Sequence, residues 1–278
     1  MLQELKDELL LHYTQTATPE HFLAVGADEI DDILARGFVP LSFVISNDPQ
    51  WTSYAVRMEA QYPCAPLFVA DEQEVLDYID QVLAAKDERE GRMARVFSPE
   101  PIGARAAFRA PKLASLSEVL VHARRLVVCE NVRSKRNAGT IMQLARELCY
   151  DAVLFAGTSP YPYARMYRLH SSGASLEIPV VTLTDWPFDL DLLKAQGFTI
   201  VGTALREDAL AIDDERLKQQ DKVALLLGSE HDGLTEEAIE RCDYLAIIPM
   251  REGIDSLNVA CAAAIALYEL GESDGTCA

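Results

Sequence analysis

Apolar residues along the chain form short continuous runs that alternate with amphipathic segments. Runs such as "RLVVCE", "DAVLFAG" and "VALLLGSE" are typical of strands that are buried on both faces. Between them, "AGTIMQLARELC" places its apolar residues three to four positions apart, as an amphipathic helix does. Buried strands separated by helices predict a parallel sheet covered on both sides. We therefore expect an α/β protein.

The alternation is interrupted once, which predicts two domains. Residues 1–100 are expected to form a small α/β domain with a parallel or mixed sheet, because "HFLAVG", "LSFVIS" and "PLFVA" have the pattern of strands. The segment "PEPIGARAAFRAP", residues 99–111, is rich in proline and is interpreted as a linker. From Ser115 the alternation restarts. The predicted domains are residues 1–110 and 111–278.

Further elements are expected in the first domain. An acidic amphipathic helix is predicted at residues 2–13, and a helix "DEIDDILARG" is predicted to end at Gly37. A helix at residues 72–86 and a strand near residues 93–98 complete the pattern.

Composition and charge are those of a soluble globular protein, with 49% hydrophobic and 25% charged residues. The net charge of −19 argues against a general attraction to nucleic acid, but the charges are unevenly distributed. Residues 91–170 contain 13 Lys or Arg against five Asp or Glu. Two interpretations remain open: a basic belt that binds phosphates, or a chance cluster on a solvated face.

Metal and membrane partners are not expected. The six cysteines are scattered, without a C-x-x-C pair or a histidine at ligand spacing, so neither structural zinc nor a disulfide framework is predicted. The longest apolar run, Val259 to Leu267, is too short to span a membrane. The first residues lack the basic-then-apolar order of a signal peptide. A cytoplasmic protein is expected.

Three polar segments at the ends of predicted strands are candidates for chemistry. The first is "ENVRSKRNAGTIMQLARELCYDAVLF", in which Asn137 is expected to cap a helix whose buried stripe includes Ile141 and Ala145. Gly139 and Gln143 are four residues apart and share another face of that helix. Backbone N–H groups at its start can hold an anion with help from Arg133, Lys135 and Arg136. The alternative is an ordinary capped helix in which glycine permits close packing.

The second segment is "VALLLGSEHDGLTEEAIERCDYLAIIPM". Ligands of open parallel sheets bind beyond the carboxyl ends of the strands, where this segment places Gly228 and Glu230. Gly228 would let a ligand approach the backbone. Glu230 is either a functional carboxylate or a solvated one, and His231 beside Asp232 is expected to be a surface histidine.

The third segment, "IDSLNVACAAAIALYEL", predicts a helix that is apolar on nearly all sides. Such a helix must be buried on several faces, in part against another subunit. Asp255 or Ser256 is expected to cap it and Gly271 to end it. Ser256 and Asn258 then either face a crevice or serve only as caps. The chain contains no G-x-G-x-x-G, P-loop, G-x-S-x-G or H-E-x-x-H pattern, so the sequence does not support a prediction of a dehydrogenase, a kinase or a hydrolase.

Together and in this order, the three segments resemble the SpoU/TrmH-type RNA methyltransferases of the SPOUT superfamily. The family patterns "NV.dp.NiGaI.RtA", "lllGsEg.Gl…cD..v.IPM" and "SLNVs.AaaI.lYE" are matched by "NVRSKRNAGTIMQLA", "LLLGSEHDGLTEEAIERCDYLAIIPM" and "SLNVACAAAIALYE". "RLHSSGASLEIPV" resembles a fourth pattern, "R.SmGa.f.lPv", with Arg168 displaced by one position. The resemblance covers about residues 120–270.

The resemblance implies a fold, a cofactor and a reaction. The fold would be a C-terminal domain with a parallel sheet and a deep trefoil knot, preceded by a small α/β substrate-binding domain. S-adenosylmethionine would be held in the knot mostly through backbone groups, and a homodimer would transfer its methyl group to a ribose 2′-hydroxyl of tRNA or rRNA. No metal takes part.

The resemblance also assigns residues by position. The cofactor-binding positions are Thr203, Gly228, Ile248, Pro249 and Leu257, and the active-site positions are Asn137, Gln143, Glu230, Ser256 and Asn258. The candidates for RNA binding are Arg133, Lys135, Arg136 and Arg168.

Gln143 departs from the family pattern, which has arginine at this position. Glutamine keeps hydrogen-bonding capacity but loses the charge, and it cannot act as a base near neutral pH. Three explanations remain open: another arginine substitutes (Arg133, Arg136, Arg146 or Arg168), the substrate differs, or the protein binds RNA or cofactor without methylating. A small-molecule enzyme is a further alternative, favoured if Arg133 and Arg136 point away from the cofactor crevice.

Overall fold

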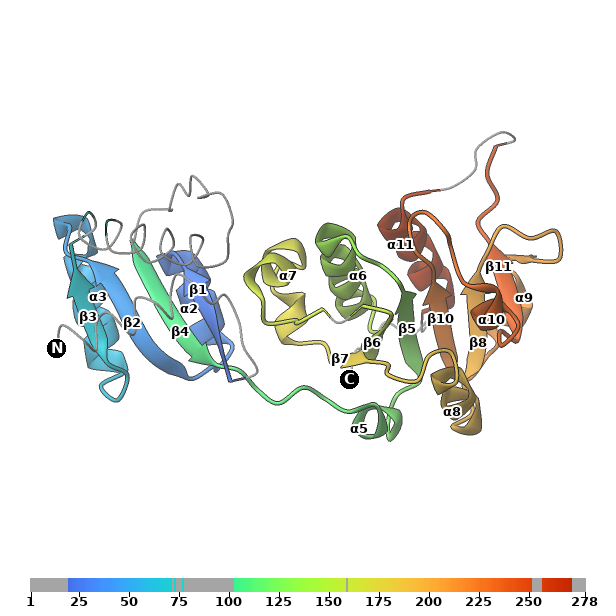
Figure 1. The fold of residues 1–278 in the computed structure, drawn as a ribbon, viewed down its shortest axis with the longest axis horizontal. Coiled ribbons are helices and arrows are strands. Elements are labelled where there is room, and N and C mark those ends of the chain that lie inside the picture. Colours follow the sequence, from blue (N-terminus) through green and yellow to red (C-terminus); the bar gives the residue numbers. More distant parts are fainter. Residues whose placement is uncertain are drawn as a thin grey trace, which may run out of the picture. The chain divides into compact units, whose positions relative to one another are not determined.

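The chain forms two β-sheets, one in each of two structural units (Figure 1). The computed structural model describes residues 20–71, 73, 77, 103–158, 160–251 and 257–271. The units comprise residues 1–112 and 113–278, whereas the sequence placed the domain boundary after residue 110.

The sheet of the first unit is mixed, with strand order β1-β4-β2-β3. β4 runs antiparallel to β1 and β2, and β2 runs parallel to β3. The strands are β1 (His21–Val25), β2 (Pro40–Ser46), β3 (Leu67–Ala70) and β4 (Ala104–Arg109). The three strands predicted in the described part of this unit are present.

The interpretation of residues 99–111 as a linker was wrong. Within this segment lies β4, an inner strand whose first five residues are buried. Its alanines, at positions 104, 106 and 107, are buried in this inner strand, against which α2 (Ala27–Ala35) packs. Pro111 lies two residues after the end of the strand, where proline removes no ladder hydrogen bond.

Two helices of different predictability accompany this sheet. α2 (Ala27–Ala35) was predicted, including its end, where Gly37 adopts φ 84°. α3 (Thr52–Gln61), which follows the 3-10 turn η1 (Pro49–Trp51), was missed because Met58 is its one buried residue and its apolar periodicity is weak. The elements predicted at residues 2–13, 72–86 and 93–98 lie outside the described residues, apart from residues 73 and 77.

The second unit contains the predicted parallel sheet. Its strand order is β7-β6-β5-β10-β8-β11-β9, and every neighbouring pair is parallel. The strands are β5 (Arg125–Glu130), β6 (Ala152–Ala156), β7 (Val180–Thr182), β8 (Thr199–Thr203), β9 (Leu210–Ala211), β10 (Val223–Leu227) and β11 (Tyr244–Ile247). The α/β prediction is confirmed.

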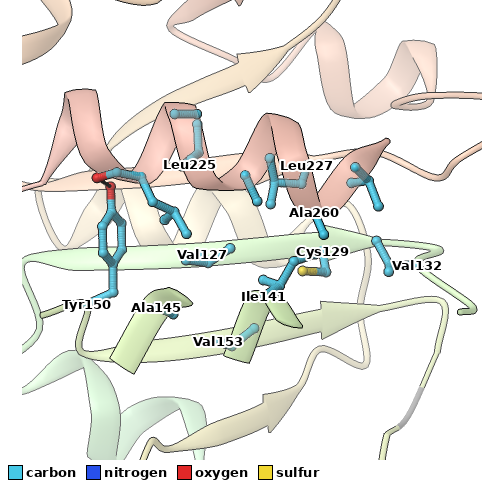
Figure 2. Packing of buried hydrophobic residues seen from close by; sticks show 14 of the residues in the cluster. Val127, Cys129, Val132, Ile141, Ala145, Tyr150, Val153, Leu225, Leu227 and Ala260 are labelled. Atoms are coloured by element: carbon cyan, nitrogen blue, oxygen red, sulfur yellow. Dashed lines mark hydrogen bonds between the residues drawn. The ribbon is translucent and has the colours of Figure 1, made fainter. Parts of the chain in front are cut away.

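Helices cover both faces of this sheet, as the continuous apolar runs require. Val127 of β5 packs on the side of α6 and α11, while its neighbours Leu126 and Val128 pack on the side of α5 and α8. Figure 2 shows the packing on the first of these two sides of the sheet, where side chains of β5, β10, α6 and α11 meet. The helices and 3-10 turns are α5 (Leu116–Leu120), α6 (Lys135–Glu147), α7 (Arg165–His170), η2 (Ala174–Leu176), α8 (Asp189–Ala195), α9 (Glu215–Lys218), α10 (Glu236–Ile239) and α11 (Val259–Leu270).

Three of the described basic residues at positions 91–170 are buried. Arg125 is buried and donates hydrogen bonds to the carbonyls of Leu270, Asp221 and Gln220, which ties the end of α11 to the sheet. Arg105 and Arg168 are also buried. The phosphate-binding interpretation is therefore restricted to the exposed members of this set.

Cysteine chemistry differs from expectation at one position. Cys149 is disulfide-bonded, whereas Cys64, Cys129, Cys242 and Cys261 are free thiols. Within the described ranges, no group of three or more His, Cys, Asp or Glu side chains is placed to hold a metal ion. No helix within those ranges is long and apolar enough to cross a membrane.

Candidate functional site

A cavity of about 520 Å³ opens where three neighbouring strands end. β10, β8 and β11 are adjacent and parallel, so their carboxyl ends lie at one edge of the sheet. Thr203 ends β8, Gly228 follows β10, and Ile248 follows β11, and all three line the cavity. The site therefore lies where ligands of open parallel sheets bind.

The walls of the cavity combine aliphatic side chains with the polar backbone of strand ends. Ile212, Leu227, Ala246 and Val259 are buried and supply its apolar surface. Of the residues expected to bind a cofactor, Thr203, Gly228, Ile248 and Leu257 line the cavity, and Pro249 is an exposed residue between two lining positions. A planar base can pack against such aliphatic walls while its polar atoms bind strand-end backbone groups.

Gly228 is required by the protein backbone itself. A Cβ at this position would lie 2.2 Å from the carbonyl carbon of Gly233 and 2.4 Å from the amide nitrogen of Leu234. The close approach lets Ser229 and Gly233 exchange two backbone hydrogen bonds, of 3.0 and 3.2 Å. The glycine therefore permits a tight turn that shapes one wall of the cavity, and its expected role toward a ligand stays a prediction.

Three of the predicted active-site residues form a hydrogen-bonded chain. Asn258 Nδ2 donates to Asn137 Oδ1 at 3.3 Å, and Asn137 Nδ2 donates to Glu230 Oε1 at 2.7 Å. These residues come from the start of α11, the first turn of α6 and the loop after β10. Glu230 lines the cavity, so this chain of hydrogen-bonded side chains lies beside the cavity. Since both ends of the Asn137 amide are used, its orientation is fixed.

The helix caps differ from the predicted ones. Ser134, rather than Asn137, caps α6, because its Oγ accepts the Asn137 N–H at 3.3 Å. This leaves the Asn137 amide to contact two other elements. Asn258 caps α11 through its Oδ1, which accepts the Ala260 N–H. Asp255 and Ser256 lie outside the described residues, so the active-site role of Ser256 stays a prediction. Gly271 ends α11 as predicted.

Gln143 takes no part in this chain. Its Nε2 donates to Glu147 Oε1 at 2.9 Å, one turn further along α6. Gly139 packs against α7, since a Cβ there would lie 2.5 Å from the Cβ of His170. The close-packing interpretation of Gly139 is therefore the right one.

Exposed positive charge surrounds the start of α6. Arg133, Lys135 and Arg136 are exposed, and among the described side chains no carboxylate forms an ion pair with them. Arg168 differs from them, because it is buried and donates to the carbonyl of Tyr163. Arg146 pairs with Glu177. Neither Arg133 nor Arg136 is among the described residues that line the cavity.

Glu130 is a residue that the sequence did not reveal. It is 1% exposed, and its carboxylate accepts hydrogen bonds from Trp186 Nε1 at 2.6 Å, Thr235 Oγ1 at 2.7 Å and Thr235 N at 2.9 Å. Thr235 caps α10, whose Glu236 and Ile239 line the cavity. Glu130 therefore positions a wall of the site. A carboxylate at the end of the apolar run "RLVVCE" was the available signal.

Two thiols near the site remain protonated at neutral pH. Burial raises the pKa of the Cys129 thiol, and the Glu230 carboxylate raises it further. Burial also raises the pKa of Cys242 to about 12. Neither thiol is activated as a nucleophile.

Comparison with known proteins assigns the family. The model of the SpoU rRNA methylase family matches residues 124–268, just over half of the chain, and this range contains every described residue of the hydrogen-bonded chain and of the cavity. The chain belongs to the SpoU rRNA methylase family. The resemblance drawn from the three sequence segments is confirmed.

Relatives of this SpoU family member match over part of their length. A tRNA/rRNA methyltransferase of Mycobacterium tuberculosis, itself uncharacterised, is 38% identical over 166 residues, which cover 59% of this chain and 57% of that protein. The 23S rRNA (guanosine-2′-O-)-methyltransferase RlmB of Coxiella burnetii is 32% identical over 145 residues, 52% of this chain and 57% of that protein. The matches thus span somewhat more than half of each relative.

Two solved methyltransferase structures share the fold over nearly the whole chain. An AdoMet-bound rRNA methyltransferase from Sinorhizobium meliloti superposes with a TM-score of 0.69 at 20% identity and covers 97% of this chain and 95% of its own. The SpoU methyltransferase AviRb from Streptomyces viridochromogenes, in complex with AdoMet, gives a TM-score of 0.69 at 22% identity, with 96% and 95% covered.

Proposed function

We propose that this protein transfers a methyl group from S-adenosylmethionine to a ribose 2′-hydroxyl of tRNA or rRNA. The observation that carries the proposal is the chain Asn258–Asn137–Glu230 at the edge of the cavity. It joins the three segments that match the family patterns. The family membership and the names of the relatives supply the class of reaction.

The cavity suits the proposed cofactor. Its size, its aliphatic walls and the strand-end backbone match an adenosine, and the acidic Glu230 and Asp232 suit a ligand with a positive sulfonium. When bound, S-adenosylmethionine supplies an electrophilic methyl group. The residues proposed to hold it are Thr203, Gly228, Ile248, Pro249 and Leu257.

Positioning of the acceptor is the proposed task of the hydrogen-bonded chain. A carboxylate has up to four acceptor sites, and Asn137 occupies one of those on Glu230. Glu230 therefore has capacity to accept a hydrogen bond from a ribose hydroxyl and orient it. Asn137 and Asn258 hold Glu230 in place, which favours transfer by reducing the entropy of alignment. Ser256 is proposed as a further member of this site.

RNA contacts are proposed for the exposed cations beside the site. Arg133, Lys135 and Arg136 lie within four residues of Asn137, so phosphates bound there would adjoin the acceptor hydroxyl. We extend the proposal to the first unit as a substrate-binding domain, to a trefoil knot around the cofactor, and to action in the cytoplasm. Arg168 is left out of the proposed RNA surface because its guanidinium is buried.

A homodimer through α11 is part of the proposal. Cys261, Ile265 and Tyr268 lie on one side of this helix, and the last two remain 40% and 74% exposed. A second copy of the chain would cover this apolar face.

Alkylation of Cys261 tests the dimer. At micromolar protein, Cys261 is expected to react with iodoacetamide several times more slowly than Cys64, although both thiols are exposed in the single chain. Dilution should speed the reaction of Cys261 alone, because it separates the subunits. Mass spectrometry of the peptides gives both rates. Equal rates at all concentrations, with a monomer mass by light scattering, would refute the dimer.

A second candidate function is a relative that binds cofactor or RNA without methylating. The contact of Gln143 with Glu147 favours it, because the position of the family arginine is here neutral and held within α6. Calorimetry with S-adenosylmethionine, paired with transfer of labelled methyl to tRNA and to rRNA, separates the two candidates. Cofactor binding without transfer to any RNA would favour the second.

Gln143→Arg tests whether the missing charge limits the reaction. The new guanidinium would be held by Glu147, so Glu147→Gln is added in a double variant and tested alone as the matched control. If the charge is limiting, transfer should rise by about tenfold or more in the double variant. Unchanged transfer would instead assign the cationic role to Arg133 or Arg136, since Arg146 and Arg168 are already engaged by Glu177 and Tyr163.

A further inference from the structure

One part of the cavity lining carries opposite charges on neighbouring side chains. Arg206, in the segment that follows β8, forms an ion pair with Glu236, the first residue of α10. Both residues line the cavity. Among the described lining residues Arg206 is the sole Lys or Arg.

This ion pair is readily exchanged for other partners. The Arg206 and Glu236 side chains are 43% and 70% exposed. Pairs this exposed stabilise a protein weakly, because water screens both charges. A ligand that offers each side chain an opposite charge can therefore replace the pair at little cost.

Other residues of the lining have a different character. Ala246, Val259 and Ile212 are buried and aliphatic. A ligand that is apolar at one end and zwitterionic at the other matches this division. The distinctive zwitterion in the proposed cofactor is its α-amino acid group.

We propose that Arg206 and Glu236 form the subsite for the amino-acid end of the cofactor. Arg206 binds the α-carboxylate, for which a guanidinium has two suitably spaced donors, and Glu236 binds the α-ammonium. One protein ion pair is replaced by two ion pairs with the ligand. The inference rests on the proposed function and adds the residues that distinguish the whole cofactor from its adenosine part.

Calorimetry with two ligands tests this assignment. S-adenosylhomocysteine carries the amino-acid end, whereas 5′-methylthioadenosine keeps the adenosine and the sulfur but lacks that end. Arg206→Gln should weaken binding of S-adenosylhomocysteine by about tenfold and leave binding of 5′-methylthioadenosine within about twofold. Glu236→Gln should show the same selectivity.

Arg124→Gln is the matched control, because Arg124 also pairs with an exposed carboxylate, that of Asp221, outside the cavity. It should change neither affinity. The thermal unfolding midpoint of each variant, expected to be close to that of the wild type, verifies that the variants are folded.

Selective loss of S-adenosylhomocysteine binding supports the subsite. Equal effects on both ligands, or no effect on either, would overturn it while leaving the proposed function intact. Failure of the wild-type protein to bind S-adenosylmethionine or S-adenosylhomocysteine would overturn the proposed function and the subsite together.

Discussion

Replacing Asn137 with alanine is expected to reduce methyl transfer by about a hundredfold or more, while the affinity for S-adenosylmethionine stays close to that of the wild type. Asn137 contacts Glu230 and Asn258 but is not among the described residues that line the cavity. Its loss would remove the hydrogen bond that holds the Glu230 carboxylate. It would also remove the hydrogen bond to Asn258, so the Asn137 side chain would no longer connect α6 to α11 and to the loop after β10. The acceptor hydroxyl would then be misaligned although the cofactor is bound.

Ser134→Ala is the control for this variant. It removes the cap of α6 at a cost of about 1 kcal/mol but keeps the Asn137 side chain. Its rate of transfer should therefore stay within a few times that of the wild type. Single-turnover rates with bound cofactor and RNA measure the chemical step for both variants. Full activity of Asn137→Ala would contradict the assigned role, as would an equal loss in Ser134→Ala.

The second large effect is expected for Gly228→Ala. The added methyl group would meet the backbone of Gly233 and Leu234 at 2.2 and 2.4 Å, and backbone cannot move aside as a flexible side chain can. The turn that lines the cavity must open, at a cost of about 1–3 kcal/mol in the free energy of unfolding. We expect the affinity for S-adenosylhomocysteine, measured by calorimetry, to fall by about tenfold or more because the cavity wall moves.

Gly197→Ala separates stability from binding. Gly197 has φ 84° at the end of α8, and an added Cβ would meet no atom within 4 Å. Alanine there should lower the free energy of unfolding by about 1 kcal/mol through backbone strain and leave the affinity unchanged. If Gly228→Ala lost no more affinity than Gly197→Ala, the tight turn would not shape the cofactor site.

Much of the second unit could be predicted from the sequence, for a physical reason. Strands buried on both faces must be continuously apolar, so "RLVVCE" and "VALLLGSE" can be predicted as strands from their local sequence alone. In the first unit this signal failed at β4, where small alanines and flanking prolines resemble a linker. Burial in a closely packed sheet, which the local sequence does not reveal, decides that Ala104–Arg109 is a strand.

The site was predicted in its residues more than in its connections. Asn137 and Glu230 are separated by 93 residues, and their contact depends on the strand order, which brings β5 beside β10. Local spacing also could not decide between Ser134 and Asn137 as the cap of α6, because both residue types are good caps. Glu130 was missed because its partners, Trp186 and Thr235, lie in distant segments.

The central claim is methyl transfer to a ribose 2′-hydroxyl, and the chemistry of RNA cleavage tests it directly. Alkali cleaves RNA through attack by the free 2′-hydroxyl, so a 2′-O-methyl group protects the adjacent phosphodiester bond. The protein is incubated with tritiated S-adenosylmethionine and unmodified tRNA and rRNA, and the RNA is then hydrolysed in alkali. We expect the label in alkali-resistant dinucleotides, and we expect Asn137→Ala to remove most of it. Label in mononucleotides, which indicates a methylated base, or no label in any RNA, would contradict transfer to a ribose 2′-hydroxyl.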